Sequence, residues 1–136
     1  MTYLLDSSAA LADIFGEPGT DRVRQLVDDP LTVVGISVLT LYEAYTAVLH
    51  RTGSEEQSRE AVAILRAAMH EVVPVTEEIV DLAMELRQAA TARIATADCI
   101  IGATAAYHGA TLVHRDPHFA ALPAGRLAQE TLPDKA

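Results

Sequence analysis

The sequence lacks the features of exported, membrane-spanning and disulfide-stabilised proteins. Its 136 residues include one cysteine, Cys99, so no disulfide forms within the chain. No stretch reaches the roughly 18 consecutive apolar residues that a membrane span requires. The N-terminus also lacks the basic and apolar regions of a secretory signal. These absences predict a protein of the reducing cytoplasm that does not contact a membrane.

Basic residues are scarce, which narrows the possible chemistry. Ten lysines and arginines stand against nineteen acidic residues, the formal net charge is −9, and Lys135 is the only lysine. This balance argues against a broad basic surface for nucleic acid. Phosphoacceptor receiver domains and haloacid-dehalogenase-like phosphatases need a lysine in their acidic pocket, and Lys135 lies next to the C-terminus. A nucleotide-binding module is also disfavoured, because no glycine-rich phosphate loop is present.

Hydrophobic residues make up 50% of the chain, which suits one globular domain with a buried core. Short apolar runs alternate with helical patterns, so we expect a three-layer α/β/α fold with a central, mostly parallel sheet. A single domain should cover residues 1–136, with a loose tail at 133–136. The expected strands are 3–5, 31–35, 71–75 and 110–114, and the expected helices are 7–15, 21–29, 37–51, 54–70, 76–90 and 96–109.

Several polar residues and one proline mark the predicted boundaries. Ser37, Ser54 and Thr76 precede helical patterns and are expected to cap the first turns. Pro74 has no N–H to donate to a sheet ladder, so strand 71–75 should lie at a sheet edge or end there.

Four acidic residues fall where a fold of this class gathers its chemistry. Asp6 ends the first strand, and Asp116 follows the last one. Asp98 lies in the first turn of the helix before that last strand, and Glu43 lies on the helix after the second strand. In open α/β sheets, ligands bind at the carboxyl ends of the strands. The four carboxylates are therefore candidates for a common site.

Each of these residues also has a structural explanation when it is considered alone. Asp6 fits a helix N-cap, and Asp98 fits the favourable end of a helix dipole with Thr96 as the cap. Asp116 fits a turn. Glu43 fits the edge of a buried stripe, from which its long side chain reaches solvent.

Taken together, the four carboxylates point to a bound cation. Converging carboxylates with no lysine nearby repel one another unless a metal neutralises them. Oxygen ligands favour Mg²⁺, with Mn²⁺ possible. Mg²⁺ keeps several waters, one of which can be activated to attack a phosphodiester, and a second ion about 4 Å away can stabilise the leaving oxygen. Such a site would account for four of the nine net negative charges.

The sequence resembles the PIN domains over essentially its whole length. The resemblance rests on "LLDSSAAL", on Glu43 within "ISVLTLYEAYTAV" and on "TADCIIGATAAYHGATLVHRDPHF", which occur in the family's order. Within the family, the chain is most similar to the VapC-type toxins of bacterial type II toxin–antitoxin pairs, which are single PIN domains of this size. The resemblance implies a Mg²⁺-dependent endoribonuclease that hydrolyses RNA phosphodiester bonds with metal-activated water.

The resemblance also implies roles for individual residues. Asp6, Glu43, Asp98 and Asp116 would hold the metal and form the catalytic set, with Asp6 and Asp98 as the foremost ligands. Ser8 occupies one position of the family's hydroxyl pair.

The residues around these ligands have expected supporting roles. Ser7 and Ser8 form the hydroxyl pair, and Ser8 is expected to hold Asp6 in place, with local capping as the alternative for both serines. His114 departs from the family, which usually has Thr or Ser two residues before the last aspartate. A histidine there binds metal, moves a proton or packs, and we favour packing or hydrogen bonding. Phe119 is expected to anchor the loop that presents Asp116.

Further expectations concern binding partners. Arg93 and Arg115 are candidate contacts for RNA phosphates, with solvated surface as the default for each. By resemblance, a cognate VapB-like antitoxin would cover the site with its tail and place a basic residue opposite the carboxylates. A homodimer is also implied, and helix 37–51 suits its contact, although the apolar residues of that helix suit the core equally. The alternative function is a PIN-like interaction module that binds metal or RNA without cleaving it.

Overall fold

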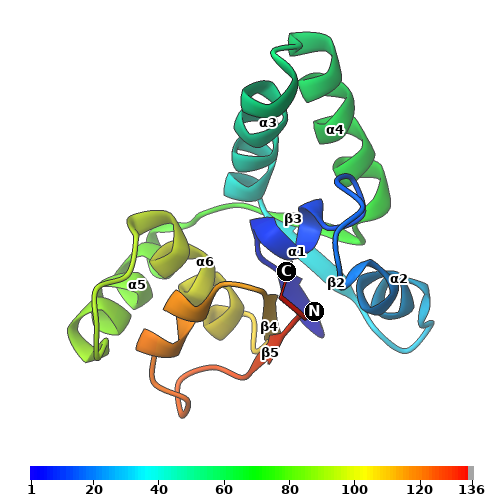
Figure 1. Cartoon of the computed structure of the whole chain (residues 1–136). Helices are drawn as coiled ribbons and strands as arrows, with labels where there is room; N and C mark the ends of the chain where they lie inside the picture. The colour runs from blue at the N-terminus through cyan, green and yellow to red at the C-terminus, as the bar shows by residue number, and fades with distance from the viewer. Residues whose placement is uncertain (135–136) are drawn as a thin grey trace.

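Strands and helices alternate along the chain, as the hydrophobic pattern predicts (Figure 1). The structure, a computed structural model, describes residues 1–134. The strands are β1 (Tyr3–Leu5), β2 (Val34–Ser37), β3 (Glu71–Val73), β4 (Thr111–His114) and β5 (Gln129–Thr131). The helices are α1 (Ser7–Leu11), α2 (Thr20–Asp28), α3 (Val38–Thr52), α4 (Glu55–Ala68), α5 (Glu77–Ala89), α6 (Thr96–Tyr107) and the short 3₁₀ helix η1 (Pro117–Ala121).

The five strands form one sheet in the order β3-β2-β1-β4-β5, and every neighbouring pair is parallel. The chain first adds β2 and β3 on one side of β1, and later adds β4 and β5 on the other side. The strand order therefore reverses between β1 and β4, which is the switch point where open α/β sheets bind ligands. The predicted three-layer α/β/α fold with a central parallel sheet is confirmed.

Two hydrophobic cores cover the two faces of the sheet. Successive residues of a strand point to opposite faces, and Leu4 and Leu112, which are paired in register, join the core under α5 and α6. Leu5 and Val113, the next pair, join the core under α1, α2, α3 and α4. All four side chains have no solvent exposure, and burying one such aliphatic side chain is worth about 1.5–3 kcal/mol. Figure 1 shows α5 and α6 together and, apart from them, the antiparallel pair α3 and α4.

The second strand begins later than its β-branched residues predict. Strand β2 spans Val34–Ser37 rather than 31–35, and Leu31 is 90% exposed. The reason is turn chemistry after α2. The Asp29 carboxylate accepts a hydrogen bond from the Leu31 backbone N–H at 2.9 Å, and the Thr32 hydroxyl donates to the Leu26 carbonyl. These bonds hold the segment in a turn, so the ladder can begin only after it.

Other boundaries are confirmed or corrected. The hydroxyls of Ser37, Ser54 and Thr76 cap α3, α4 and α5, as predicted. Strand β3 ends just before Pro74 and lies at the edge of the sheet, as predicted. Helix α1 ends at Leu11 rather than at residue 15, because the chain turns after it. Strand β5 was not predicted, since its three residues are polar and too few to show a period.

Helix α3 combines core residues with an exposed apolar edge. Leu41, Ala44 and Val48 are buried, whereas Val38 and Tyr42 are 43% and 69% exposed. The expectation that apolar residues of this helix belong to the core is therefore confirmed for Leu41, Ala44 and Val48, and the contact with a second copy stays a prediction. Among the helices of residues 1–134, none has the length and apolar character that crossing a bilayer requires.

The segment after β5 is tied at Pro133 to the residue that follows β4. The Pro133 carbonyl accepts a hydrogen bond from the Arg115 side chain at 2.8 Å. The predicted loose tail began at residue 133, and its last two residues, 135–136, lie outside the described part of the chain.

Candidate functional site

The first and last candidate carboxylates follow two neighbouring strands, at the switch point of the sheet. Asp6 follows β1 directly, and Asp116 stands two residues beyond the end of β4. The Asp6 backbone N–H donates to the Val113 carbonyl at 3.0 Å, so the two strand ends are joined at this position. The residues are far apart in sequence, and only the pairing of β1 with β4 brings them together.

Asp6 is held firmly by the start of α1. Its Oδ1 atom accepts hydrogen bonds from the Ala9 backbone N–H at 2.9 Å and from the Ser8 hydroxyl at 2.7 Å. Asp6 is therefore the N-cap of α1, as its simpler explanation predicted. Capping occupies one carboxylate oxygen and leaves Oδ2 for a ligand. The Ser8 hydroxyl supports Asp6 instead of capping the helix itself.

The environment of Asp6 disfavours its charge. The side chain is 4% exposed, and burial raises the pKa of Asp6 from 3.8 to about 6. The bonds from Ser8 and Ala9 oppose this rise in pKa, whereas the nearby charges of Asp98 and Asp116 add to it. Part of the free-energy cost of charging Asp6 thus comes from its carboxylate neighbours, and a cation would relieve their repulsion.

Asp98 lies in the first turn of α6 and, like Asp6, is affected by the charge of Asp116. Burial raises the pKa of Asp98, and the charges of Asp116 and Glu43 raise it further, while His118 lowers it. Within residues 1–134, the Asp98 carboxylate has no hydrogen-bond or ion-pair partner. Ala95 occupies the cap position of α6 and Thr96 is its first helical residue, so the expected Thr96 cap is wrong.

Glu43 is brought to the site by a contact between two helices. The Ser7 hydroxyl on α1 donates to Glu43 Oε1 on α3 at 2.5 Å. This bond holds a long side chain that would otherwise move freely in solvent. Ser7 and Ser8 thus hold different carboxylates, Glu43 and Asp6, and neither serine caps α1.

Asp116 caps η1 and pairs with a histidine. Its Oδ1 atom accepts from the His118 backbone N–H at 2.8 Å and lies 2.9 Å from His118 Nδ1. The turn predicted at Asp116 is therefore present. The contribution of His118 was not predicted, because a spacing of two residues also suits a solvated side chain. The signal that could have revealed it is the capping geometry of an aspartate followed by proline.

The donor set fits a hydrated, oxygen-preferring cation. The charges of Asp98 and Asp116 act on Asp6, and those of Asp116 and Glu43 act on Asp98. However, within residues 1–134 no three acidic, histidine or cysteine side chains are arranged closely enough to form a ready-made metal site. The carboxylate oxygens are the type of ligand that Mg²⁺ takes, and Mg²⁺ commonly binds one or two carboxylates directly and reaches other groups through its waters.

His114 reaches the edge strand rather than standing free in the site. Its Nε2 atom lies 2.8 Å from Gln129 Oε1, and its ring centroid lies 4.7 Å from that of the buried Phe119 ring, with the two rings tilted by 44°. The Gln129 amide in turn donates to the Phe119 carbonyl at 3.1 Å. Burial lowers the pKa of His114. These contacts agree with the favoured explanation of packing and hydrogen bonding, and they show Phe119 anchoring η1.

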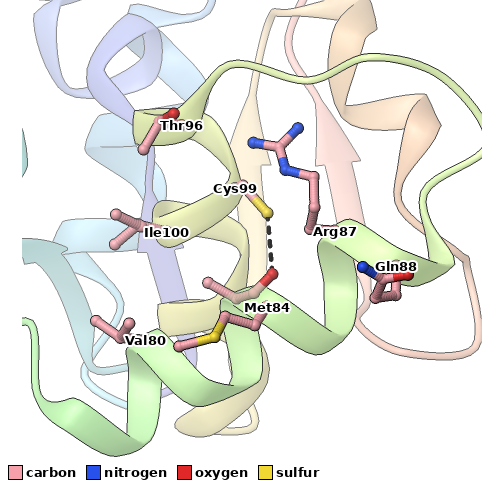
Figure 2. Close-up of a pocket in the computed structure, with 8 residues that line it drawn as sticks. Val80, Met84, Arg87, Gln88, Thr96, Cys99 and Ile100 are labelled. Atoms are coloured by element: carbon pink, nitrogen blue, oxygen red, sulfur yellow. Dashed lines mark hydrogen bonds between the residues drawn. The ribbon is translucent and has the colours of Figure 1, made fainter.

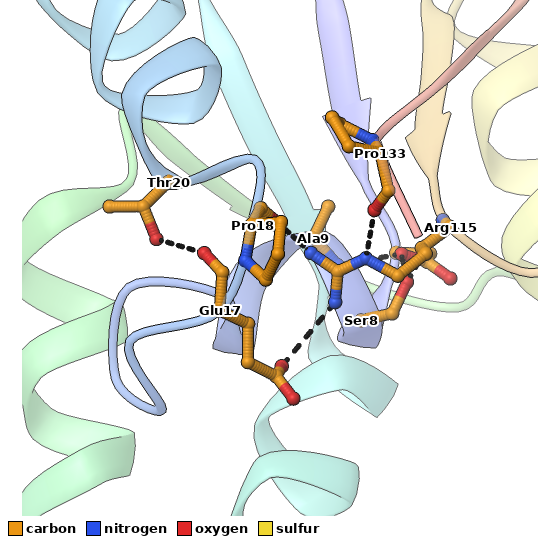
Figure 3. A network of polar contacts seen from close by, with 8 residues as sticks. Ser8, Ala9, Glu17, Pro18, Thr20, Arg115 and Pro133 are labelled. Carbon is orange, nitrogen blue, oxygen red and sulfur yellow. Dashed lines mark hydrogen bonds and ion pairs between the residues drawn. The ribbon is translucent and has the colours of Figure 1, made fainter. Parts of the chain in front are cut away.

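The two candidate arginines have different surroundings. Arg115 is only 7% exposed, and its guanidinium is bound to Pro133, Pro18 and Glu17 (Figure 3). The expectation of a solvated side chain is wrong here, and its donors are not free to bind RNA. Arg93 is exposed in the segment before α6, as expected. That segment is fixed by a hydrogen bond from the Thr91 N–H to the Ala121 carbonyl at the end of η1.

A pocket of about 410 Å³ lies between α5 and α6, next to the turn that carries Asp98. Figure 2 shows Val80 and Met84 on α5 and Thr96 and Ile100 on α6 around it. Cys99 forms part of the wall, and its thiol donates to the Ala83 carbonyl at 3.4 Å. Burial raises the pKa of Cys99, which agrees with an inert thiol.

Solved structures share this fold along nearly the whole chain. VapBC2 from Rickettsia felis, bound to a promoter DNA fragment, matches with a TM-score of 0.79 and 22% identity over 98% of this chain and 100% of that chain. VapBC-5 from Mycobacterium tuberculosis matches with a TM-score of 0.66 and 26% identity over 98% of both chains. VapC20 from the same organism, a sarcin–ricin loop cleaving toxin, matches with a TM-score of 0.70 and 24% identity over 97% of this chain and 100% of that chain.

The sequence was also compared with curated proteins and with models of protein families. A comparison with curated protein sequences gives no match. The PIN domain family model, in contrast, matches residues 3–125, which include all four candidate carboxylates and every strand except β5. The chain therefore belongs to the PIN domain family.

Proposed function

We propose that the protein is a VapC-type toxin, a Mg²⁺-dependent endoribonuclease that cleaves RNA phosphodiester bonds by hydrolysis. The observation that carries this proposal is the arrangement at the switch point of the sheet, where the β1–β4 junction holds Asp6 and helix α1 directs Glu43 through Ser7. Asp98 and Asp116 lie close enough to raise the pKa of Asp6, and Glu43 lies close enough to raise that of Asp98. Family membership supports it, as does the likeness of the fold to solved VapBC proteins. An RNA-cleaving protein of this kind would act in the cytoplasm.

The carboxylates divide the work according to their contacts. Asp6 and Asp98 are the foremost ligands, because Asp6 keeps Oδ2 free and Asp98 is unpartnered within residues 1–134. Glu43 and Asp116, held by Ser7 and His118, complete the acidic wall. A bound Mg²⁺ supplies positive charge at the scissile phosphate and makes a water molecule more acidic.

RNA binding must rely on few cations, because most arginines are already engaged. Ion pairs engage four of them, Arg22, Arg24, Arg59 and Arg126. Arg87 binds the Ile94 carbonyl, and Arg51 lies over the Phe15 ring. Arg115 is buried. Within residues 1–134, Arg66 and Arg93 have no such partner. Arg93 is the one beside α6 and η1, so we assign it to an RNA phosphate near Asp98 and Asp116.

An inhibitory partner is part of the proposal. The similar structures include toxin–antitoxin complexes, and we propose a VapB-like antitoxin for this chain. Its tail would place an Arg or Lys near Asp6, Glu43 and Asp98, since a guanidinium can replace the metal charge and fork across carboxylates. Replacing that basic residue by Ala should weaken inhibition more than replacing its apolar neighbours in the antitoxin tail. Excess Mg²⁺ should partly restore cleavage in the complex.

A homodimer is the third element of the proposal. The exposed Val38 and Tyr42 on α3 offer apolar area for a second copy of the chain. Sedimentation of the parent and of a Tyr42→Arg variant tests this contact, and a parent that sediments as a monomer would rule it out.

Metal-dependent cleavage by the purified chain tests the central proposal. RNA incubated with the protein and Mg²⁺ should be cut, whereas chelator or an Asp6→Asn replacement should stop the cutting. Mn²⁺ should also support the reaction. Metal binding without any cleavage would instead favour the alternative, an interaction module that binds metal or RNA without turnover.

A further inference from the structure

We propose that Arg115 is a positioning residue for the carboxylate cluster, an inference that rests on the proposed function. The side chain is 7% exposed and lies directly before Asp116 in sequence. A buried guanidinium is costly unless acceptors surround it. The acceptors around Arg115 come from distant parts of the chain, and their placement ties those parts to the site.

Three segments meet at the Arg115 side chain (Figure 3). Nε donates to the Pro133 carbonyl at 2.8 Å, which fixes the segment after β5. One terminal nitrogen donates to the Pro18 carbonyl, and the other lies 3.4 Å from Glu17 Oε1. Both of these acceptors belong to the turn between α1 and α2. The guanidinium therefore clamps the turn after α1 and the segment after β5 onto the end of β4.

The main chain of the same residue reaches the cluster. The Arg115 backbone N–H donates to the Ser8 hydroxyl at 3.1 Å, and that hydroxyl donates to Asp6 Oδ1 at 2.7 Å. A continuous path thus runs from the buried guanidinium through the Arg115 backbone to Asp6. Asp116 is the next residue along the chain from Arg115. The position of Arg115 consequently sets the spacing between the two carboxylates that the β1–β4 junction brings together.

Arginine is needed for this clamp because of its shape. Its planar fork supplies five N–H donors, which allows three acceptors in different directions to be bound at once. A lysine keeps the charge but concentrates its donors on one atom, so it cannot satisfy the same three acceptors. The Arg115→Lys variant should therefore retain the charge while loosening the β4 end.

The decisive measurement is Mg²⁺ affinity in the absence of RNA. Titration calorimetry on Arg115→Lys should show a Mg²⁺ dissociation constant about tenfold weaker than that of the parent, the lower end of what supporting residues contribute at metal sites. At saturating Mg²⁺, the KM for RNA should change less than about twofold, while kcat partly recovers. A raised KM with unchanged Mg²⁺ affinity would mean that Arg115 contacts RNA, and would overturn the proposal.

A matched control separates positioning from general stability. Arg22 forms a similar two-pronged ion pair with Glu130, joining α2 to β5, but has no bond to the cluster. The Arg22→Gln variant should lose stability while keeping parental Mg²⁺ affinity. If both variants change Mg²⁺ affinity equally, Arg115 is only a structural tie and the proposal fails. If the parent itself neither binds Mg²⁺ nor cleaves RNA, the proposed function fails first.

A double-mutant cycle tests the path through Ser8. Ser8→Ala removes the hydroxyl that links the Arg115 backbone to Asp6. If Arg115 acts along this path, the loss of Mg²⁺ affinity in the double variant should be smaller than the combined losses of the single variants. Independent, additive losses would show that the path is not used. If Arg115→Lys fails to fold, the Glu17→Gln variant can replace it, because it weakens one of the three contacts of the guanidinium. We then expect a two- to threefold loss of Mg²⁺ affinity in Glu17→Gln and no loss in Arg22→Gln.

Discussion

Ser7 on α1 donates a hydrogen bond of 2.5 Å to the Glu43 carboxylate on α3, thirty-six residues away. This bond directs a glutamate on a helix surface toward the cluster. Replacing Ser7 by Ala should release the side chain, lowering the cleavage rate about threefold to tenfold, with a stability loss of about 1 kcal/mol. Cleavage assays and chemical denaturation measure the two effects.

A nearby threonine provides the control for the Ser7 variant. The Thr46 hydroxyl donates to the backbone carbonyl of Glu43 at 3.0 Å and does not touch its carboxylate. Thr46→Ala should leave the cleavage rate unchanged. Equal rate losses in both variants would indicate that α3 as a whole, rather than the orientation of the Glu43 carboxylate, matters for cleavage.

Asp98 offers the sharpest test of the metal site. Its carboxylate has no hydrogen-bond or ion-pair partner within residues 1–134, so Asp98→Asn should leave the fold intact. The same replacement should lower the rate of Mg²⁺-dependent RNA cleavage by about a hundredfold or more. Circular dichroism checks the fold, and a gel assay measures the rate. Glu78→Gln, an exposed acid in the first turn of α5, is the matched control for loss of a dipole interaction. A parental rate in Asp98→Asn would remove this residue from the ligand set.

His114 stands where the PIN domains usually have a hydroxyl residue. Restoring that hydroxyl with His114→Thr should cost stability, because the Gln129 contact and the ring contact with Phe119 are both lost. We expect a loss of about 2 kcal/mol and no gain in Mg²⁺ affinity. Thermal melts and calorimetry measure these quantities. Tighter Mg²⁺ binding in the variant would instead indicate that a hydroxyl at this position assists the metal.

The sequence predicts the framework well, because the framework depends on local patterns. Helix caps are predictable because residues such as Ser37 and Thr76 prefer the cap position. Strands β1 and β4 are predictable because their apolar runs are visible within a few residues. Strand β5 and the delayed start of β2 escape prediction. The first forms only through pairing with β4, and the second depends on hydrogen bonds of Asp29 and Thr32 that no period reveals.

The candidate carboxylates are predictable from their places at strand and helix ends, but their supporting contacts are not. The sequence suggests that Ser8 helps Asp6, since the two are near neighbours. It does not suggest that Ser7 would reach Glu43, or that Arg115 would be buried between Glu17 and Pro133. These contacts join segments that only tertiary packing brings together, and a charged residue in a sequence is by default expected at the surface.

The last prediction concerns the charge of Asp6 in the metal-free protein. Its pKa is raised from 3.8 to about 6, so the folded state holds the proton more tightly than the unfolded state. The resulting destabilisation is absent below about pH 4, grows as pH rises to about 6 and then stays constant, at roughly 3 kcal/mol. Asp6→Asn should therefore melt at a higher temperature than the parent at pH 7.5, by about 5–10 °C.

The same variant keeps the helix cap, since an Asn oxygen can still accept from Ala9 and Ser8. Its advantage over the parent should shrink between pH 7.5 and pH 5, as the Asp6 carboxyl of the parent becomes protonated. Mg²⁺ should stabilise the parent more than the variant, because only the parent has the full charge to neutralise. Melting curves with chelator and with Mg²⁺ at both pH values test this, with the exposed Asp21→Asn on α2 as control. An advantage that is independent of pH, or equal Mg²⁺ shifts in parent and variant, would mean that the charge of Asp6 is not part of a shared cation site.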